Sequence, residues 1–218
     1  MINCTGILAI LLVALASQSI AEEVLYSEKV LLSGTHDPRH ITFVYKDGEK
    51  LSGVHIGVKY SALWNLDSTE DREWFNAIYS KDNGLILKHL TKPIEFRLVG
   101  QITNHPIDRI LKKCYDKVGG SSMGIQQCLV KHDILINVEI ERAYQLLEEN
   151  GEDIKGLKDS WRKFRLTKIN YIKQFYSKFS GTKWLYKSMK EVVDNDNNHQ
   201  IILNGWIENV YGYSQKDT

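Results

Sequence analysis

Three runs in the first half of the chain alternate hydrophobic and polar residues, which is the period of a β-strand. Their hydrophobic positions are Ile41, Phe43 and Tyr45, then Val54, Ile56, Val58 and Tyr60, and finally Ile94, Phe96 and Leu98. The sequence Lys46-Asp47-Gly48 between the first two runs is typical of a tight turn. These patterns predict a β-hairpin and at least one further antiparallel strand.

One helix is expected within the same half. Asp67, Ser68 or Thr69 can cap a helix whose apolar residues are Trp74, Phe75, Ile78 and Tyr79, and Asn83-Gly84 would end it. Residues 22–104 are therefore predicted to form a small α+β domain, a small antiparallel β-sheet with one helix.

Helical spacing replaces the alternation after Asn104-His105-Pro106. Pro106 suits a first helical position, and Gly119-Gly120 would end the first helix. A long second helix to about Asn150, a third from Asp153 to Phe179, and two short helices near 182–194 and 199–211 follow. Short connections favour antiparallel neighbours. The expected fold class is α+β, with a mainly antiparallel helical bundle and one disulfide in residues 105–218.

The first 21 residues resemble a signal peptide. Ile7 to Ala16 form an apolar run of about ten residues, and Ser19 and Ala21 supply a small-x-small cleavage pattern. A retained membrane anchor is the alternative, but a bilayer crossing takes about 20 apolar residues. We therefore expect cleavage after Ala21 and export to the periplasm of a bacterial envelope.

Two cysteines, Cys114 and Cys128, remain after that cleavage. In an oxidising compartment an even number of cysteines favours a disulfide, which closes a loop of about 15 residues and contributes about 3 kcal/mol in the chain-entropy model. Two buried free thiols are the alternative, and a metal site lacks the usual ligand spacing.

The charge and the remaining motifs exclude several classes of function. The 28 Lys/Arg and 27 Asp/Glu residues nearly cancel, which argues against a nucleic-acid partner. The histidines are scattered, no phosphate-binding glycine loop is present, and Glu139 and Glu141 do not share a helix face. We therefore expect no enzyme, no cofactor and no metal.

The helical half resembles the LprI-type lysozyme-inhibitor family. Over about 60 residues, Cys114 and Cys128 are followed by the segment 139–144, with Glu139, Glu141 and Tyr144, and then by the segment 161–165, with Trp161, Phe164 and Arg165. Glu141 replaces the usual Asn, Leu166 replaces an Asp, and Ile169 stands where a third cysteine is common. The resemblance implies a periplasmic helical domain, and members of the family inhibit lysozyme.

The expected function is binding and inhibition of a peptidoglycan-cleaving enzyme, either a host lysozyme or an effector of a rival bacterium. The alternative is a non-inhibitory scaffold protein of the envelope. The candidate partner-binding loop contains Lys117, Gly119, Gly120, Ser121 and Ser122, although its glycines also suit an ordinary turn. A second candidate is the loop from Asp194 to His199. The motif aromatics are expected in the core, and Arg165 is expected either to bridge helices or to contact the partner.

Overall fold

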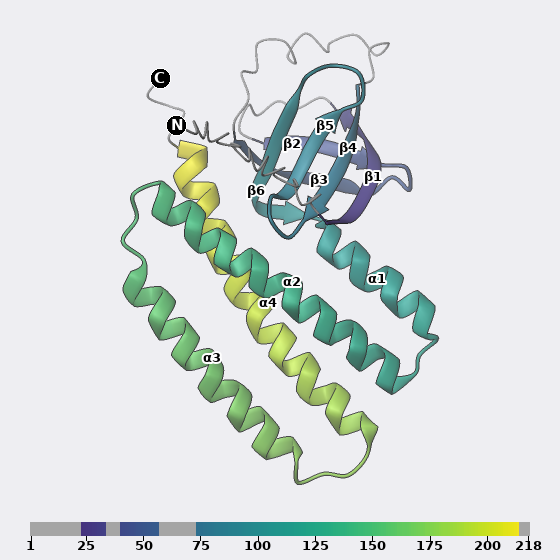
Figure 1. Ribbon diagram of the computed structural model, residues 1–218, viewed down its shortest axis with the longest axis vertical. Coiled ribbons are helices and arrows are strands. Elements are labelled where there is room, and N and C mark those ends of the chain that lie inside the picture. Colours follow the sequence, from purple (N-terminus) through teal and green to yellow (C-terminus); the bar gives the residue numbers. More distant parts are fainter. Residues whose placement is uncertain (1–22, 34–39, 57–72, 214–218) are drawn as a thin grey trace, which may run out of the picture.

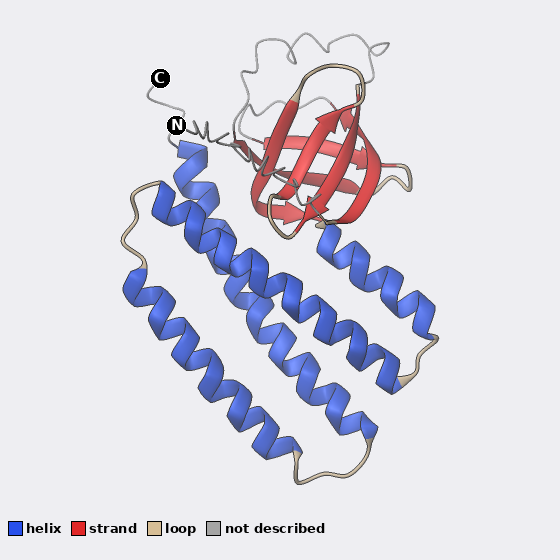
Figure 2. Ribbon diagram, viewed as in Figure 1, coloured by secondary structure: helices blue, strands red, loops and turns tan. Residues whose placement is uncertain are grey.

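Six antiparallel strands close into a barrel in the order β1-β2-β3-β6-β5-β4. The computed structural model describes residues 23–33, 40–56 and 73–213 (Figures 1 and 2). The strands are β1 (Val24–Ser33), β2 (His40–Tyr45), β3 (Lys50–Ile56), β4 (Trp74–Ser80), β5 (Gly84–His89) and β6 (Glu95–Thr103). Because β1 pairs with both β2 and β4, the described sheet has no free edge.

The inside of the barrel is a packed core. The rings of Phe43, Phe75 and Phe96 lie within 5.3 to 5.5 Å of one another between centroids. Inward positions alternate along each strand, as the pleat requires. The other fully buried large side chains of the barrel are Tyr45, Tyr79, Leu51, Leu85 and Leu87. These side chains occupy the interior, as is usual for a barrel with so few strands.

The predicted sheet-and-helix unit is wrong, because the segment expected to be helical is strand β4. Phe75, Ala77 and Tyr79 alternate into the barrel and are fully buried, whereas Trp74 is exposed. Asn83-Gly84 ends no helix: Asn83 lies in the turn before β5, and Gly84, with φ 73°, is the first residue of that strand. The apolar residues fit both periods, and pairing on both sides with β1 and β5 decides for a strand.

Two strands, β1 and β5, carry little alternation and were not predicted individually. β5 is only six residues long and begins with consecutive buried residues, Gly84 and Leu85.

The hairpin of β2 and β3 is confirmed, with Phe43 opposite Leu51. The proposed helix caps at 67–69, the positions Val58 and Tyr60, and the signal peptide 1–21 lie outside the described residues. The broad expectation of a mixed α and β protein with a disulfide agrees with the structure.

Four helices follow the barrel: α1 (Pro106–Val118), α2 (Ser122–Glu149), α3 (Lys155–Tyr176) and α4 (Thr182–Tyr213). In Figure 1, α1 leaves the barrel, α2 runs back alongside it, and α4 crosses behind α2 with α3 on the outer side. None of the helices described in residues 106–213 combines the length and the hydrophobicity that a bilayer crossing requires.

The expected loop at 194–199 is also wrong, because α4 is continuous from Thr182 to Tyr213. Asp196 and His199 of this segment are buried against the other helices instead of being exposed. A polar stretch is typical of a loop when its side chains face water. Here tertiary contacts provide the hydrogen-bond partners of Asp196 and His199, so a helix is formed instead.

Barrel and helices share hydrophobic contacts. Ile107 of α1 and Leu135 of α2 join the core of the barrel. On the outer surface, Val54 of β3 lies opposite Val99 of β6, and both pack into the core of the helical bundle. α4 contacts β6 along this seam. The two parts of the chain are therefore held against each other by apolar burial.

Candidate functional site

The turn between α1 and α2 is exposed and covalently braced. We call residues 117–122 the α1–α2 tip. A disulfide joins Cys114 of α1 to Cys128 of α2, with 5.8 Å between their Cα atoms. The side chain of Ser121 caps α2 by accepting a hydrogen bond from the backbone N–H of Gly124. The expected disulfide is thus present at the base of the tip, together with a side-chain cap on α2.

The candidate residues Lys117, Gly119, Gly120, Ser121 and Ser122 are all exposed. The two glycines have φ angles of 59° and 81°, in the left-handed region that favours glycine. A Cβ atom at either position would meet no other atom within 4 Å, so their backbone conformation alone requires glycine. The tip therefore presents open backbone groups and one cation to solvent.

Arg109 fixes the start of α1 to the barrel. Its guanidinium lies 3.8 Å from the ring centroid of Tyr45, and its Nη1 donates to Oε2 of Glu49 at 2.6 Å. Nη2 donates to carboxylates of Asp47 at 2.8 Å and of Glu28 at 3.1 Å. Such charge-assisted contacts restrain the direction in which α1 leaves the barrel. Helix α1 is consequently held to the barrel at its start and to α2 by the disulfide near the tip.

Two of the family-motif aromatics meet a histidine of α4. Tyr144 is fully buried, and its hydroxyl lies 2.6 Å from Nε2 of His199. Trp161 of α3 stacks on the same imidazole with a centroid distance of 3.6 Å. Burial lowers the pKa of His199 to about 4, so the ring is neutral at neutral pH. These contacts join α2, α3 and α4 and leave Tyr144 no access to a partner.

Arg165 bridges the same three helices. Its Nε donates to Oδ2 of the buried Asp196 at 2.6 Å, and its Nη2 donates to Oδ2 of Asp133 at 3.2 Å. Asn137 donates a further hydrogen bond to Asp196. Burial and the neighbouring Asp196 raise the pKa of Asp133 to about 6. Of the two roles expected for Arg165, the structure places it in a helix-bridging position.

The remaining motif residues lie apart from one another. Glu139 pairs with Arg142, whose guanidinium also donates to the backbone oxygen of Lys81 in the β4–β5 turn. Glu141 accepts hydrogen bonds from Arg162 at 2.9 Å. Phe164 is 51% exposed, so its expected place in the core is wrong.

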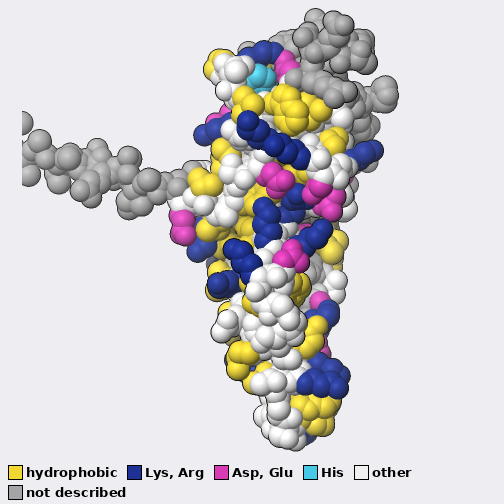
Figure 3. All heavy atoms as spheres, turned by 90° about the vertical axis from the view of Figure 1, so that its right-hand side faces the viewer, with side chains coloured by type: hydrophobic (Ala, Val, Ile, Leu, Met, Phe, Trp, Pro, Cys, Tyr) yellow, Lys and Arg dark blue, Asp and Glu magenta, His cyan; other side chains and the backbone are white. Residues whose placement is uncertain are grey.

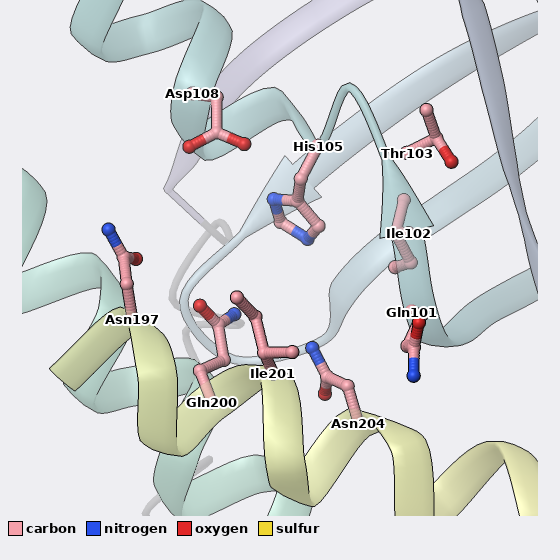
Figure 4. Close-up of a pocket in the computed structure, with 9 residues that line it drawn as sticks. All are labelled: Gln101, Ile102, Thr103, His105, Asp108, Asn197, Gln200, Ile201 and Asn204. Carbon is pink, nitrogen blue, oxygen red and sulfur yellow. The ribbon is translucent and has the colours of Figure 1, made fainter. Parts of the chain in front are cut away.

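A pocket of about 460 Å³ lies between β6, the start of α1 and the middle of α4 (Figure 4). Its volume is within the range of ligand-binding pockets. Four carboxamide side chains surround it, and none of them hydrogen-bonds a residue in the described part of the chain. The lining residues are Gln101, Ile102, Thr103, His105, Asp108, Asn197, Gln200, Ile201 and Asn204.

His105 at this pocket is neutral at neutral pH, because burial lowers its pKa to about 4. Its Nδ1 accepts a hydrogen bond from the backbone N–H of Ile107, so the ring proton is on Nε2. Four carboxamides and a neutral imidazole suit a polar ligand, since each amide offers one donor and one acceptor group, and Asp108 adds a carboxylate at the same pocket. Sequence reasoning missed this site because it placed 194–198 in a loop. The three-, four- and seven-residue spacing from Asn197 to Asn204 is the helical signal that was available.

Metal binding finds no support in the described residues, where no group of three or more His, Cys, Asp or Glu side chains could hold an ion. Asp133 and Asp196 both pair with Arg165. They do not form a paired-carboxylate site with Glu139 or Glu141. The candidate surfaces of the described chain are thus the α1–α2 tip, the carboxamide pocket and the exposed faces of the helices.

Comparison with protein-family models, with curated proteins and with solved structures finds no match to this chain. The resemblance to the LprI-type family therefore depends on the sequence motifs alone.

Proposed function

We propose that this chain is an exported periplasmic protein that binds a peptidoglycan-cleaving enzyme of the lysozyme type and inhibits it. The enzyme comes either from a host or from a rival bacterium, and in the second case the chain is an immunity protein. The observation that carries this proposal is the exposed α1–α2 tip, which is braced by a disulfide and presents Lys117.

The tip matches the chemistry of such an active-site cleft. Glycoside hydrolases of this type place two carboxyl groups on either side of the bond that they cleave. A lysine ammonium group and the backbone N–H groups of Gly119 and Gly120 are donors to which carboxylates bind well. A loop that is already ordered loses little conformational entropy on binding, which favours tight association.

The sequence resemblance supports the same class of function. The order of Cys114, Cys128, Tyr144 and Trp161 along the chain is that of LprI-type domains. Because Tyr144 and Trp161 contact His199 inside the helical bundle, they stabilise the bundle. The proposed binding surface is therefore the tip and not the motif residues themselves.

The test is a turbidity assay of cell-wall lysis with a panel of lysozymes and peptidoglycan-cleaving effectors. We expect stoichiometric inhibition of at least one enzyme, and Lys117→Glu should weaken binding at least about tenfold, as for a charged residue at the centre of an interface. Lys131→Glu makes the same charge change at an exposed position of α2 and serves as the matched control.

The outcomes separate the proposal from a scaffold role. Equal inhibition by both variants would show that another surface blocks the enzyme. Binding to a hydrolase without any loss of its activity would favour a non-inhibitory envelope scaffold, and the absence of any hydrolase partner would contradict the proposal.

A further inference from the structure

Electric charge is divided unevenly along the chain, although its total is close to zero. Residues 160–190 contain nine Lys or Arg and no Asp or Glu. Since the whole chain has 28 Lys/Arg and 27 Asp/Glu, the remainder holds 19 basic and 27 acidic residues. We call residues 160–190 the basic end. It comprises most of α3 and the first turns of α4, and the connection between them lies farthest from the barrel (Figure 1).

Most lysines of the basic end have no carboxylate to neutralise them. Arg162, Arg165 and Lys190 pair with Glu141, with Asp133 and Asp196, and with Asp194, respectively. Five exposed lysines form no ion pair with any residue that the structure describes. They are Lys163, Lys173, Lys178, Lys183 and Lys187. Their charges therefore remain available to an anionic surface.

Large apolar side chains are exposed between these lysines. Tyr171 is 65% exposed, Leu166 63% and Leu185 50%. Phe175 and Phe179, both more than 40% exposed, cluster with Tyr176 and Trp184 around the turn between α3 and α4. In Figure 3, lysine and hydrophobic side chains lie next to one another at the narrow end of the molecule. Exposed apolar side chains gathered in this way mark an interaction surface.

We propose that the basic end docks on the surface of a bilayer that contains anionic phospholipid. Helices that lie at membrane surfaces combine lysines on one side with aromatic and leucine side chains on the other, and the lysines are attracted to anionic headgroups. The aliphatic side chains Leu166 and Leu185 favour acyl chains over nucleic acid, whose bases stack on aromatic rings. Docking at this end leaves the barrel facing away from the bilayer.

Vesicle binding tests this directly. The protein from Glu22 onward is used, so that the apolar segment Ile7–Ala16 cannot insert by itself. We expect co-sedimentation with vesicles of phosphatidylcholine mixed with phosphatidylglycerol, no binding to phosphatidylcholine alone, and loss of binding at high salt. Trp184 should move to a less polar environment in the same titration, with a blue shift of the protein's fluorescence.

Two quadruple variants with equal charge change isolate the basic end. The first replaces Lys173, Lys178, Lys183 and Lys187 by Gln, and it should weaken vesicle binding at least about a hundredfold. The control replaces Lys46, Lys50, Lys81 and Lys131, which are exposed elsewhere, by Gln and should bind as the unchanged protein does. Circular dichroism confirms that both variants fold.

Three results would overturn the proposal. One is an absence of binding to the anionic vesicles, and another is equal weakening by both quadruple variants. The third is binding of double-stranded DNA through the four lysines in the absence of vesicle binding, which would assign the surface to nucleic acid. The vesicle assay contains no hydrolase, so its failure leaves the proposed inhibition untouched and is distinguishable from it.

Discussion

At the scale of single residues, the hydrophobic interior of the helical bundle contains a few buried polar side chains. Asp196 is fully buried beside Arg165, and His199 lies between Tyr144 and Trp161. Buried polar groups are tolerated only when they are hydrogen-bonded, and each of these has a partner on another helix. Such pairs orient helices more specifically than apolar contacts do, because they have one favourable geometry.

The partly buried carboxylate of Asp133 makes the stability of this cluster depend on pH. Its folded-state pKa of about 6 lies above the ordinary value of 3.8, so its contribution is fully present below about pH 4 and is lost as the pH rises through 6. The free energy of unfolding of Asp133→Asn, relative to that of the unchanged protein, should therefore rise as the pH increases from about 4 to about 7. Urea unfolding at both pH values measures this, with Asp159→Asn on the exposed side of α3 as the control.

At the scale of secondary-structure elements, the disulfide and Arg109 determine how α1 and α2 are held. The bond between Cys114 and Cys128 lies next to the tip, and Arg109 lies at the opposite end of α1. α3 is different, since Ile172 is its only fully buried residue among those described. The first helical hairpin is thus linked covalently, whereas α3 leaves most of its surface exposed.

Removal of the disulfide should destabilise this hairpin. The double variant Cys114→Ala, Cys128→Ala is expected to lower the free energy of unfolding by about 3 kcal/mol, because the unfolded chain regains the entropy of an open loop of about 15 residues. Denaturant titration measures the loss, and peptide mapping without reduction should join the two cysteines in the unchanged protein. Freely alkylated thiols in the native protein would contradict the assignment.

At the scale of the whole molecule, a near-neutral total conceals a basic end and an acidic remainder. Net charge describes long-range behaviour, whereas binding depends on local charge within a Debye length of about 8 to 10 Å. The near-zero net charge therefore describes the average surface and not the basic end, whose local charge is positive. A folded chain with a net positive charge at one end and a net negative charge over the remainder behaves as a dipole.

Acid should destabilise the molecule as a whole. Burial lowers the pKa of His55, His105, His132 and His199 to about 4, below the ordinary 6.5. Their stabilising contribution is present above 6.5 and is lost as the pH falls towards 4, since the unfolded chain takes up protons first. At about pH 5 the free energy of unfolding should be lower by at most about 2 kcal/mol for each histidine. Equal urea midpoints at about pH 5 and pH 7.5 would contradict this.

Helices α1 to α3 could be located from the sequence because their signals are local. Pro106, Gly119, Ser121 and Gly151 act on the few residues around them, and helical periodicity extends over the segments between. The β2–β3 hairpin and the pairing of Cys114 with Cys128 likewise connect positions close together in the chain.

Closure of the barrel, the strand at 74–80 and the continuity of α4 depend on partners distant in sequence. The spacing of Phe75 and Tyr79 is compatible with a helix or a strand, and pairing with β1 decides for the strand. Asp196 is compatible with an exposed loop, and its hydrogen bond with Arg165 keeps it buried in a helix. The carboxamide pocket exists only where β6, α1 and α4 meet, whereas the charge run of the basic end is continuous in the sequence. Local composition and spacing thus determined helices α1 to α3, the disulfide and the charge of residues 160–190. Long-range pairing decided the closed sheet, the continuous α4 and the pocket, because burial is a property of the folded molecule.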